Sequence, residues 1–317
     1  MSEADMIAVV RANSQRPTLK TLSKCAERAR SGDGLAQRQV VAAQCWAAFS
    51  APAGIESVYD ALAAGWFGQA SPTDDGLSGV PEVAIPDALW DALRAILADA
   101  EGFDAGTITA RVAALGALTD PGFGELAEAA AAGHPKANDP VHQQVPPLID
   151  VPSLADADAE SLAGQLYHML VENGYDAEVL DREAIGLAAL PPALRYVNTR
   201  ILQMHDVWHL AAGYRTTALH EIAISAFQLA QFGHNYSAMF LAAVGAISLH
   251  RSPEGYGLLM QTVLEAWQHG RQTPSLMAID WEQHWRKPLD EVREDFSIAP
   301  FAGSFPADLL EQLNPAT

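Results

Sequence analysis

Apolar residues recur every three or four positions in long, alanine-rich segments of the chain, which is the spacing of amphipathic α-helices. No segment shows a convincing alternation of apolar and polar residues, so the pattern predicts an all-α protein built as a multi-helix domain. The expected helices lie within residues 18–50, 55–68, 87–132, 158–173, 176–187, 192–212, 218–232, 235–250 and 253–269, and a last short helix begins at Pro288.

Glycine, serine and proline mark the ends of several of these helices. Gly213, Gly233 and Gly270 stand where a glycine in the left-handed conformation commonly ends a helix. Ser252 is placed to cap the helix that follows it, and Pro253 suits the first turn of that helix. These signals predict where neighbouring helices are separated.

Two stretches rich in proline, glycine and small polar residues interrupt the helical pattern. Residues 71–86 are expected to form a linker or long loop after an N-terminal helical segment. Residues 133–153 contain five prolines and cannot be a continuous helix. We therefore expect the chain to fold as helical blocks joined by long connections.

Composition narrows the classes of function. The chain carries 39 acidic and 19 basic residues, a net charge of −20, which disfavours binding to nucleic acid and leaves apolar contact as the route to a membrane surface. Cys25 and Cys45 lack a nearby cysteine partner, which favours a reducing compartment and no thiolate metal site. The N-terminus shows no signal peptide, and the apolar run 238–249 is too short to span a bilayer. We therefore expect a cytoplasmic protein.

Three groups that bind metals or protons share one face of a predicted helix. At about 100° per residue, His205, Asp206 and His209 fall within an arc of about 100°. Their side chains can therefore converge on one point. A lone pair of histidines four residues apart is often a surface accident, but the adjacent aspartate strengthens the case for a metal site.

Glu221 is expected to join this cluster from the next helix. His209 lies four residues before Gly213, and Glu221 lies four residues after Thr217, so in an antiparallel helix pair both stand about 6 Å from the turn. Two imidazoles and two carboxylates form a mixed nitrogen and oxygen site suited to zinc, iron, manganese or another divalent ion. The sequence therefore predicts a metal site on an antiparallel helix pair.

Two known metal motifs are close to this pattern without matching it. Residues 205–209, HDVWH, differ from the zincin motif by an aspartate in place of the glutamate that acts as general base, which disfavours a metallopeptidase. The His-Asp doublet also occurs in all-α HD-type phosphohydrolases, which need further ligands from other helices. His168 and Asp280 are available for that role, and this alternative stays open.

Longer stretches around the cluster carry a family resemblance. The text "RYVNTRILQMHDVWHLAAGY", then "LHEIAISAFQLAQFG", then "AWQHGRQTPSLMAIDWEQHWRKPLDEVRE" is similar to the ubiquinone (coenzyme Q) biosynthesis proteins of the Coq-four family. It follows that family's HDxxH motif, its eleven-residue gap to a glutamate and its C-terminal tryptophan and proline pattern. The resemblance covers residues 194–298 and extends less clearly from residue 87. Residues 1–86 are then an N-terminal helical extension of unknown role, and residues 87–317 are a Coq-four-like domain.

The resemblance implies a function and a set of site residues. His205, Asp206, His209 and Glu221 match the family's metal-binding and catalytic positions, with zinc as the first choice and iron, manganese or magnesium as alternatives. The implied activity is oxidative removal of the C1 carboxyl group from a polyprenylated hydroxybenzoate, within a complex of ubiquinone-biosynthesis enzymes at the inner membrane. The implied partners are a polyprenylated quinone precursor, the other enzymes and the membrane surface, and a homodimer stays open.

Some features leave alternatives to the enzyme. His220 stands where the family has glycine, and it is a candidate fifth ligand or a partner of the ligands. Arg200 is another possible partner of the ligands, and it could pair instead with a substrate carboxylate or an acidic residue. The apolar segment 238–249 suits a wall against an isoprenoid tail, but it equally suits a buried core helix. A non-catalytic lipid-binding scaffold with a structural metal therefore remains a second hypothesis.

Overall fold

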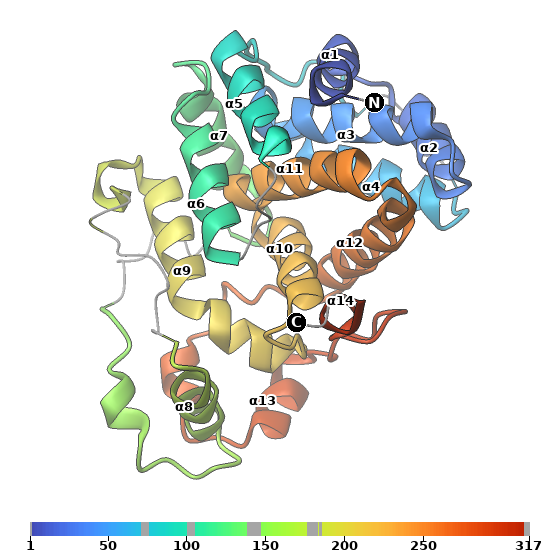
Figure 1. Ribbon diagram of the computed structural model, residues 1–317. Helices are drawn as coiled ribbons and strands as arrows, with labels where there is room; N and C mark the ends of the chain where they lie inside the picture. Colours follow the sequence, from blue (N-terminus) through green and yellow to red (C-terminus); the bar gives the residue numbers. More distant parts are fainter. Residues whose placement is uncertain are drawn as a thin grey trace.

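The computed structural model describes residues 2–70, 76–99, 105–137, 147–175, 183 and 186–313. Within these ranges the chain is all-α, as predicted, and a single β-bridge joins Ser161 to Pro288. Figure 1 shows helices crossing one another at many angles, with α11 running through the middle of the upper part of the molecule.

Four helices form the N-terminal part. They are α1 (Glu3–Asn13), α2 (Leu19–Arg30), α3 (Gly34–Phe49) and α4 (Ile55–Trp66), with a 3-10 turn, η1 (Pro52–Gly54), before α4. Side chains of Thr18 and Asp33 accept backbone N–H groups at the starts of α2 and α3, which satisfies donors that a helix start leaves free. Helix α1 lies outside the expected ranges, although Met6 and Val10 are buried.

The middle of the chain supplies α5 (Asp87–Ala98), α6 (Ala105–Gly116), α7 (Phe123–Gly133) and α8 (Leu162–Asn173), with the 3-10 turn η3 (Val151–Leu154) before α8. The expected helical stretch 87–132 is thus three helices. Helix α8 begins later than expected because the side chain of Ser161 caps it by accepting the N–H of Gly164. The helix expected at 176–187 falls largely outside the described residues, before the 3-10 turn η4 (Leu187–Ala189).

The C-terminal part consists of α9 (Pro192–Ala212), α10 (Ala218–Phe232), α11 (Asn235–Arg251), the turn η5 (Pro253–Gly255), α12 (Tyr256–Gln272), the turn η6 (Trp281–His284), α13 (Leu289–Phe296) and α14 (Leu309–Leu313). Gly213 and Gly233 end α9 and α10 with positive φ angles of 77° and 62°, as predicted. The same prediction for Gly270 was wrong. It lies inside α12, where a Cβ atom would approach the Phe227 carbonyl oxygen to 2.7 Å, so glycine there permits close contact between α12 and α10.

One continuous core joins the N-terminal and C-terminal helices, and it includes the buried indoles of Trp46 and Trp208. Helix α11 lies within this core and packs on α3, α10, α6 and α12. The segment 238–249 is therefore mostly enclosed by protein, in agreement with the core-helix alternative. In the described part of the chain, no helix combines the length and the apolar character that crossing a bilayer requires.

Candidate metal centre

The side chains of the predicted cluster meet where α9 and α10 adjoin. The Nε2 atoms of His205 and His209 lie 3.0 Å apart. The two carboxylate oxygens of Glu221 each lie 3.3 Å from one of these nitrogens. Asp206 completes the group, because His205, Asp206 and His209 each have one possible ligand atom within 4.8 Å of the others. The four residues that the sequence singled out are thus neighbours in space.

The ring of His209 is fixed by the turn that follows α9. Its Nδ1–H donates to the backbone carbonyl of Tyr214 at 3.2 Å, which leaves Nε2 with a lone pair facing the cluster. The left-handed Gly213 makes this turn possible, and the backbone N–H of Phe301 donates to Ala212 O at 2.8 Å beside it. The C-terminal segment therefore holds the turn from outside.

His205 has a comparable partner in Gln228 of α10. The Gln228 amide lies 2.8 Å from His205 Nδ1, and the glutamine is almost fully buried. A metal bound at His205 Nε2 requires a proton on Nδ1, and that proton needs an acceptor. Since the oxygen and nitrogen of a side-chain amide can exchange places by a flip, Gln228 Oε1 supplies this acceptor.

The ionisable groups of the cluster shift one another's pKa values. Burial acts to raise the pKa of Glu221, but the imidazoles of His205 and His209 beside its carboxylate outweigh it and hold the pKa far below its usual range. Burial acts to lower the pKa of His205, but Glu221 outweighs it and the pKa is raised. For Asp206, burial dominates and raises the pKa. These carboxylates and imidazoles share a confined space, and a divalent ion would neutralise the carboxylates.

The donor set and its spacing fit such an ion. Ligand atoms about 2.0–2.2 Å from a tetrahedral zinc ion lie roughly 3.3–3.6 Å from one another. The 3.3 Å separations of Glu221 from both histidines agree with this spacing. The hydrogen bonds to Tyr214 and Gln228 add the support from neighbouring groups that metal-bound histidines require. His205, His209 and Glu221 could therefore hold one divalent ion, with Asp206 beside both histidines.

The structure gives His220 a role in the turn between α9 and α10. Its Nδ1 accepts the backbone N–H of Arg215 at 2.9 Å, and its ring contacts Tyr214 and Phe301 edge-on. Burial lowers the pKa of His220, so the ring favours the neutral form that accepts this bond. These contacts make His220 a support of the turn. Because Nδ1 accepts this bond, the proton of the neutral ring lies on Nε2, and neither nitrogen has a free lone pair for a metal.

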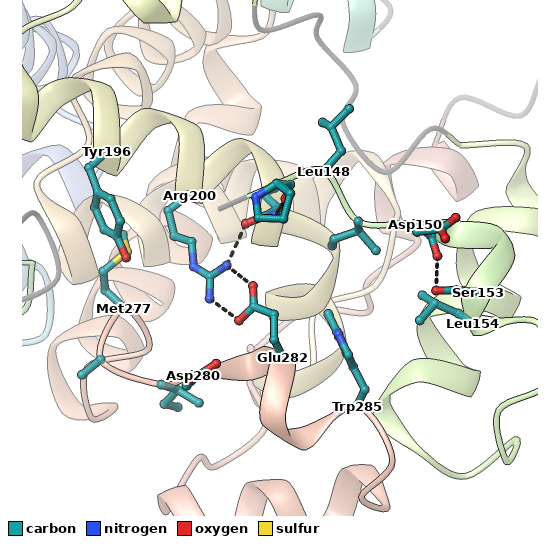
Figure 2. Close-up of a pocket in the computed structure, with 15 residues that line it drawn as sticks. Leu148, Asp150, Ser153, Leu154, Tyr196, Arg200, Met277, Asp280, Glu282 and Trp285 are labelled. Carbon is teal, nitrogen blue, oxygen red and sulfur yellow. Dashed lines mark hydrogen bonds and ion pairs between the residues drawn. The ribbon is translucent and has the colours of Figure 1, made fainter. Parts of the chain in front are cut away.

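Arg200 points away from the cluster, to the other face of α9. It forms a bidentate ion pair with Glu282, with nitrogen to oxygen distances of 2.6 and 2.9 Å, and also donates to Gln203. Figure 2 shows this pair in the wall of a cavity of about 420 Å³, with Tyr196 and Trp285. Arg200 therefore pairs with an acidic residue, which is one of the two partners that the sequence allowed.

The additional residues of an HD-type site do not join the cluster. Asp280 lines the cavity beside Arg200, and His168 is an exposed residue of α8 that lies 3.9 Å from Glu172. The HD-type alternative therefore receives no support from the positions of these two side chains.

Sequence reasoning missed Gln228, although a signal for it existed. Gln228 follows Glu221 by seven residues, which is almost two full turns, so both side chains lie on the same face of α10. The carbonyl of Tyr214 left no comparable signal, because every residue carries that group.

Comparisons with known proteins match the part of the chain that contains this site. Residues 146–302 match the family model of the coenzyme Q (ubiquinone) biosynthesis protein Coq4. The ubiquinone biosynthesis protein COQ4 homolog, mitochondrial, of Mus musculus is 33% identical over 107 residues, which is 34% of this chain and 40% of that protein. The corresponding protein of Danio rerio is 33% identical over 106 residues, or 33% and 38%. The matches thus span about 40% of the length of these relatives.

A solved structure shows the same fold. The crystal structure of a chain described as a ubiquinone biosynthesis protein, from Nostoc punctiforme, superposes with a TM-score of 0.51 at 23% identity. It covers 67% of this chain and 97% of that one. The family match includes α9 and α10 with all four cluster residues. Through residues 146–302, the chain belongs to the coenzyme Q biosynthesis protein Coq4 family.

Proposed function

We propose that this protein acts in ubiquinone biosynthesis and removes the C1 carboxyl group of a polyprenylated hydroxybenzoate intermediate in a metal-dependent reaction. The observation that carries the proposal is that His205, Asp206 and His209 have ligand atoms within 4.8 Å of one another and that Glu221 lies 3.3 Å from both histidines. Membership of the Coq4 family supports the pathway. The site chemistry supports the reaction type, because loss of carbon dioxide leaves negative charge on the ring that a cation stabilises.

The residues of the chain have separate parts in this reaction. His205, His209 and Glu221 would hold the ion, and Asp206 would offer a further carboxylate oxygen. When bound, a divalent ion supplies Lewis-acid stabilisation of charge on the ring oxygens. Val207 and Trp208 are fully buried in the same stretch of α9, so protein of low dielectric borders the site and strengthens the interaction.

The proposed setting is the cytoplasmic surface of the inner membrane, in contact with other enzymes of the pathway. An amphipathic substrate favours this setting, because its hydrocarbon tail partitions into lipid while its charged ring reaches the metal. The net charge of −20 implies that membrane contact is apolar.

The test is the substitution Glu221→Ala, with Glu291→Ala of the exposed face of α13 as the matched control. We expect cells that depend on Glu221→Ala to accumulate the carboxylated polyprenyl intermediate, while its circular dichroism spectrum stays that of the wild type. Normal quinone content in these cells would refute the enzyme. The scaffold hypothesis predicts instead that quinone content follows binding to partner enzymes, which co-purification from the same cells measures.

A further inference from the structure

Two triplets of helices in this chain follow the same plan. The first is α2, α3 and α4, and the second is α10, α11 and α12. In each, a left-handed glycine separates the first two helices, and a Pro-x-Gly 3-10 turn precedes the third. The glycines Gly32 and Gly233 are 201 positions apart, and so are the prolines Pro52 and Pro253. A shift of 201 therefore relates the two triplets from these glycines onward.

The two triplets also pack in the same way. Helix α2 has its most extensive contacts with α4, as α10 has with α12. Between the triplets, α3 packs on its equivalent α11, and α4 packs on its equivalent α12. Figure 1 shows both pairs side by side, in blue and orange. Contact between equivalent helices is the arrangement that a two-fold axis produces.

A reciprocal pair of hydrogen bonds crosses this interface. Trp66 Nε1 donates to Gln261 Oε1 at 2.7 Å, and Trp267 Nε1 donates to Asp60 Oδ1 at 2.8 Å. The shift of 201 converts Trp66 into Trp267 and Asp60 into Gln261, so each bond is the counterpart of the other. Both indoles are at most 1% exposed. In a symmetric dimer, residue i contacts residue j and the reverse contact occurs as well, and here both occur within one chain.

One contact marks the axis itself. Gln44 and Gly245 are also 201 positions apart, and they touch, because a Cβ atom on Gly245 would lie 3.4 Å from Gln44 Oε1. A residue that contacts its own equivalent lies on the two-fold axis. Gly245 leaves the space at this point that the glutamine side chain occupies.

We infer that the face formed by α11 and α12 is a self-association surface, whose fitting partner is a second copy of the α10–α12 unit. Residues 19–66 are an internal copy of that unit, and they occupy the surface within the same chain. The inference is independent of the proposed function. It explains why residues outside the Coq4 family match share a core with it.

The internal copy does not repeat the metal ligands. Helix α1 ends 199 positions before α9 ends, and α2 begins 199 positions before α10 begins, so a shift of 199 relates the helices that precede the two triplets. With this shift, the equivalents of His205 and His209 are Met6 and Val10. Within the described residues, the chain is thus a fused pseudo-dimer with one candidate metal centre.

The first experiment vacates the surface in the full-length chain. The double substitution Val41→Glu and Gln44→Glu places two charges on α3 where it meets α11, which should separate the two helices. We expect the backbone amides of α11 to exchange hydrogen faster than in the wild type. The mass measured by light scattering at about 100 µM protein should double from 33.8 kDa, because the vacated face binds a second chain. Adding Gly245→Glu puts two glutamates against each other on the axis of that dimer, which should restore the monomer. A monomeric double variant, an α11 that stays protected, or a dimer insensitive to Gly245→Glu would each overturn the inference.

The second experiment keeps the fold intact and tests the equivalence of Asp60 and Gln261. If the two positions have the same geometry, Asp60→Gln retains the bond to Trp267 and loses only the partly exposed ion pair with Arg271, which keeps its pair with Glu56. This variant should therefore unfold within about 1 °C of the wild type. Asp60→Leu leaves the indole N–H without an acceptor and should unfold several degrees lower. Equal losses for the two variants would show that the positions are not equivalent.

Discussion

The ion pair between Arg200 and Glu282 gives the most direct test of the packing around α9. Arg200 is 5% exposed, whereas the Glu282 side chain is 40% exposed. Removing one partner of a fully buried pair costs about 3–5 kcal/mol. Because Glu282 reaches solvent and Gln203 still accepts from Arg200, we expect Glu282→Gln to lower the free energy of unfolding by about 2 kcal/mol.

Thermal denaturation measures this loss. With an unfolding entropy of about 2.1 cal/mol/K per residue, a chain of 317 residues loses about 3 °C in Tm for 2 kcal/mol. Glu291→Gln, which removes an exposed carboxylate from α13, should change Tm by less than about 1 °C. Adding Arg200→Met to Glu282→Gln should recover most of the loss, because the buried charge is then absent.

The loss should also depend on pH. Burial acts to raise the pKa of Glu282, but the bonds and charge of Arg200 outweigh it and lower the pKa below its ordinary value of 4.5. A carboxyl group with a lowered pKa stabilises the fold above its unfolded pKa, and this contribution disappears as pH falls through the folded pKa. The difference between wild type and Glu282→Gln should therefore be full at pH 7 and shrink below about pH 4. A difference that matches Glu291→Gln at pH 7 would refute the reasoning.

Further predictions concern the metal, the α10–α12 contact and the membrane. Elemental analysis of purified protein should find about one divalent ion per chain in the wild type and much less in His209→Ala. The control variant His168→Ala should keep the wild-type metal content, and equal content in all three proteins would exclude the site. Gly270→Ala should lower the free energy of unfolding by about 1–3 kcal/mol in urea denaturation, because its Cβ would meet Phe227 O at 2.7 Å. Gly257→Ala in the same helix has open space and should not destabilise, so equal losses would contradict this account. Binding to liposomes should survive raised salt, since screening weakens only charge attraction, and release by salt alone would show that the contact is electrostatic.

Local signals made the helices of the site predictable. The expected bounds 192–212 and 218–232 are those of α9 and α10, because prolines and glycines stand at their ends. The arc of His205, Asp206 and His209 followed from helix geometry alone, and the structure brings Glu221 against both histidines. Helical periodicity is sufficient for such positions, since the cluster involves two consecutive helices.

Features that depend on distant parts of the chain could not be predicted. The partner of Arg200 lies 82 residues away, and no periodicity connects them. Gly270 has the sequence signature of a helix end, but the approach of α10 explains it. The two helix triplets have few identical residues at equivalent positions, because helices of different sequence can pack in the same arrangement. The hydrogen bonds of Trp66 and Trp267 are among the few side-chain features that both triplets have.

The bond between Phe301 and Ala212 has a consequence for synthesis of the protein. The turn that orients His209 is tied to a segment that is synthesised after all four cluster residues. Until Phe301 has left the ribosome, the nascent helices carry the cluster but lack the hydrogen bond that holds the turn from outside. The proposed metal affinity should consequently be weak in a ribosome complex that is stalled before Phe301.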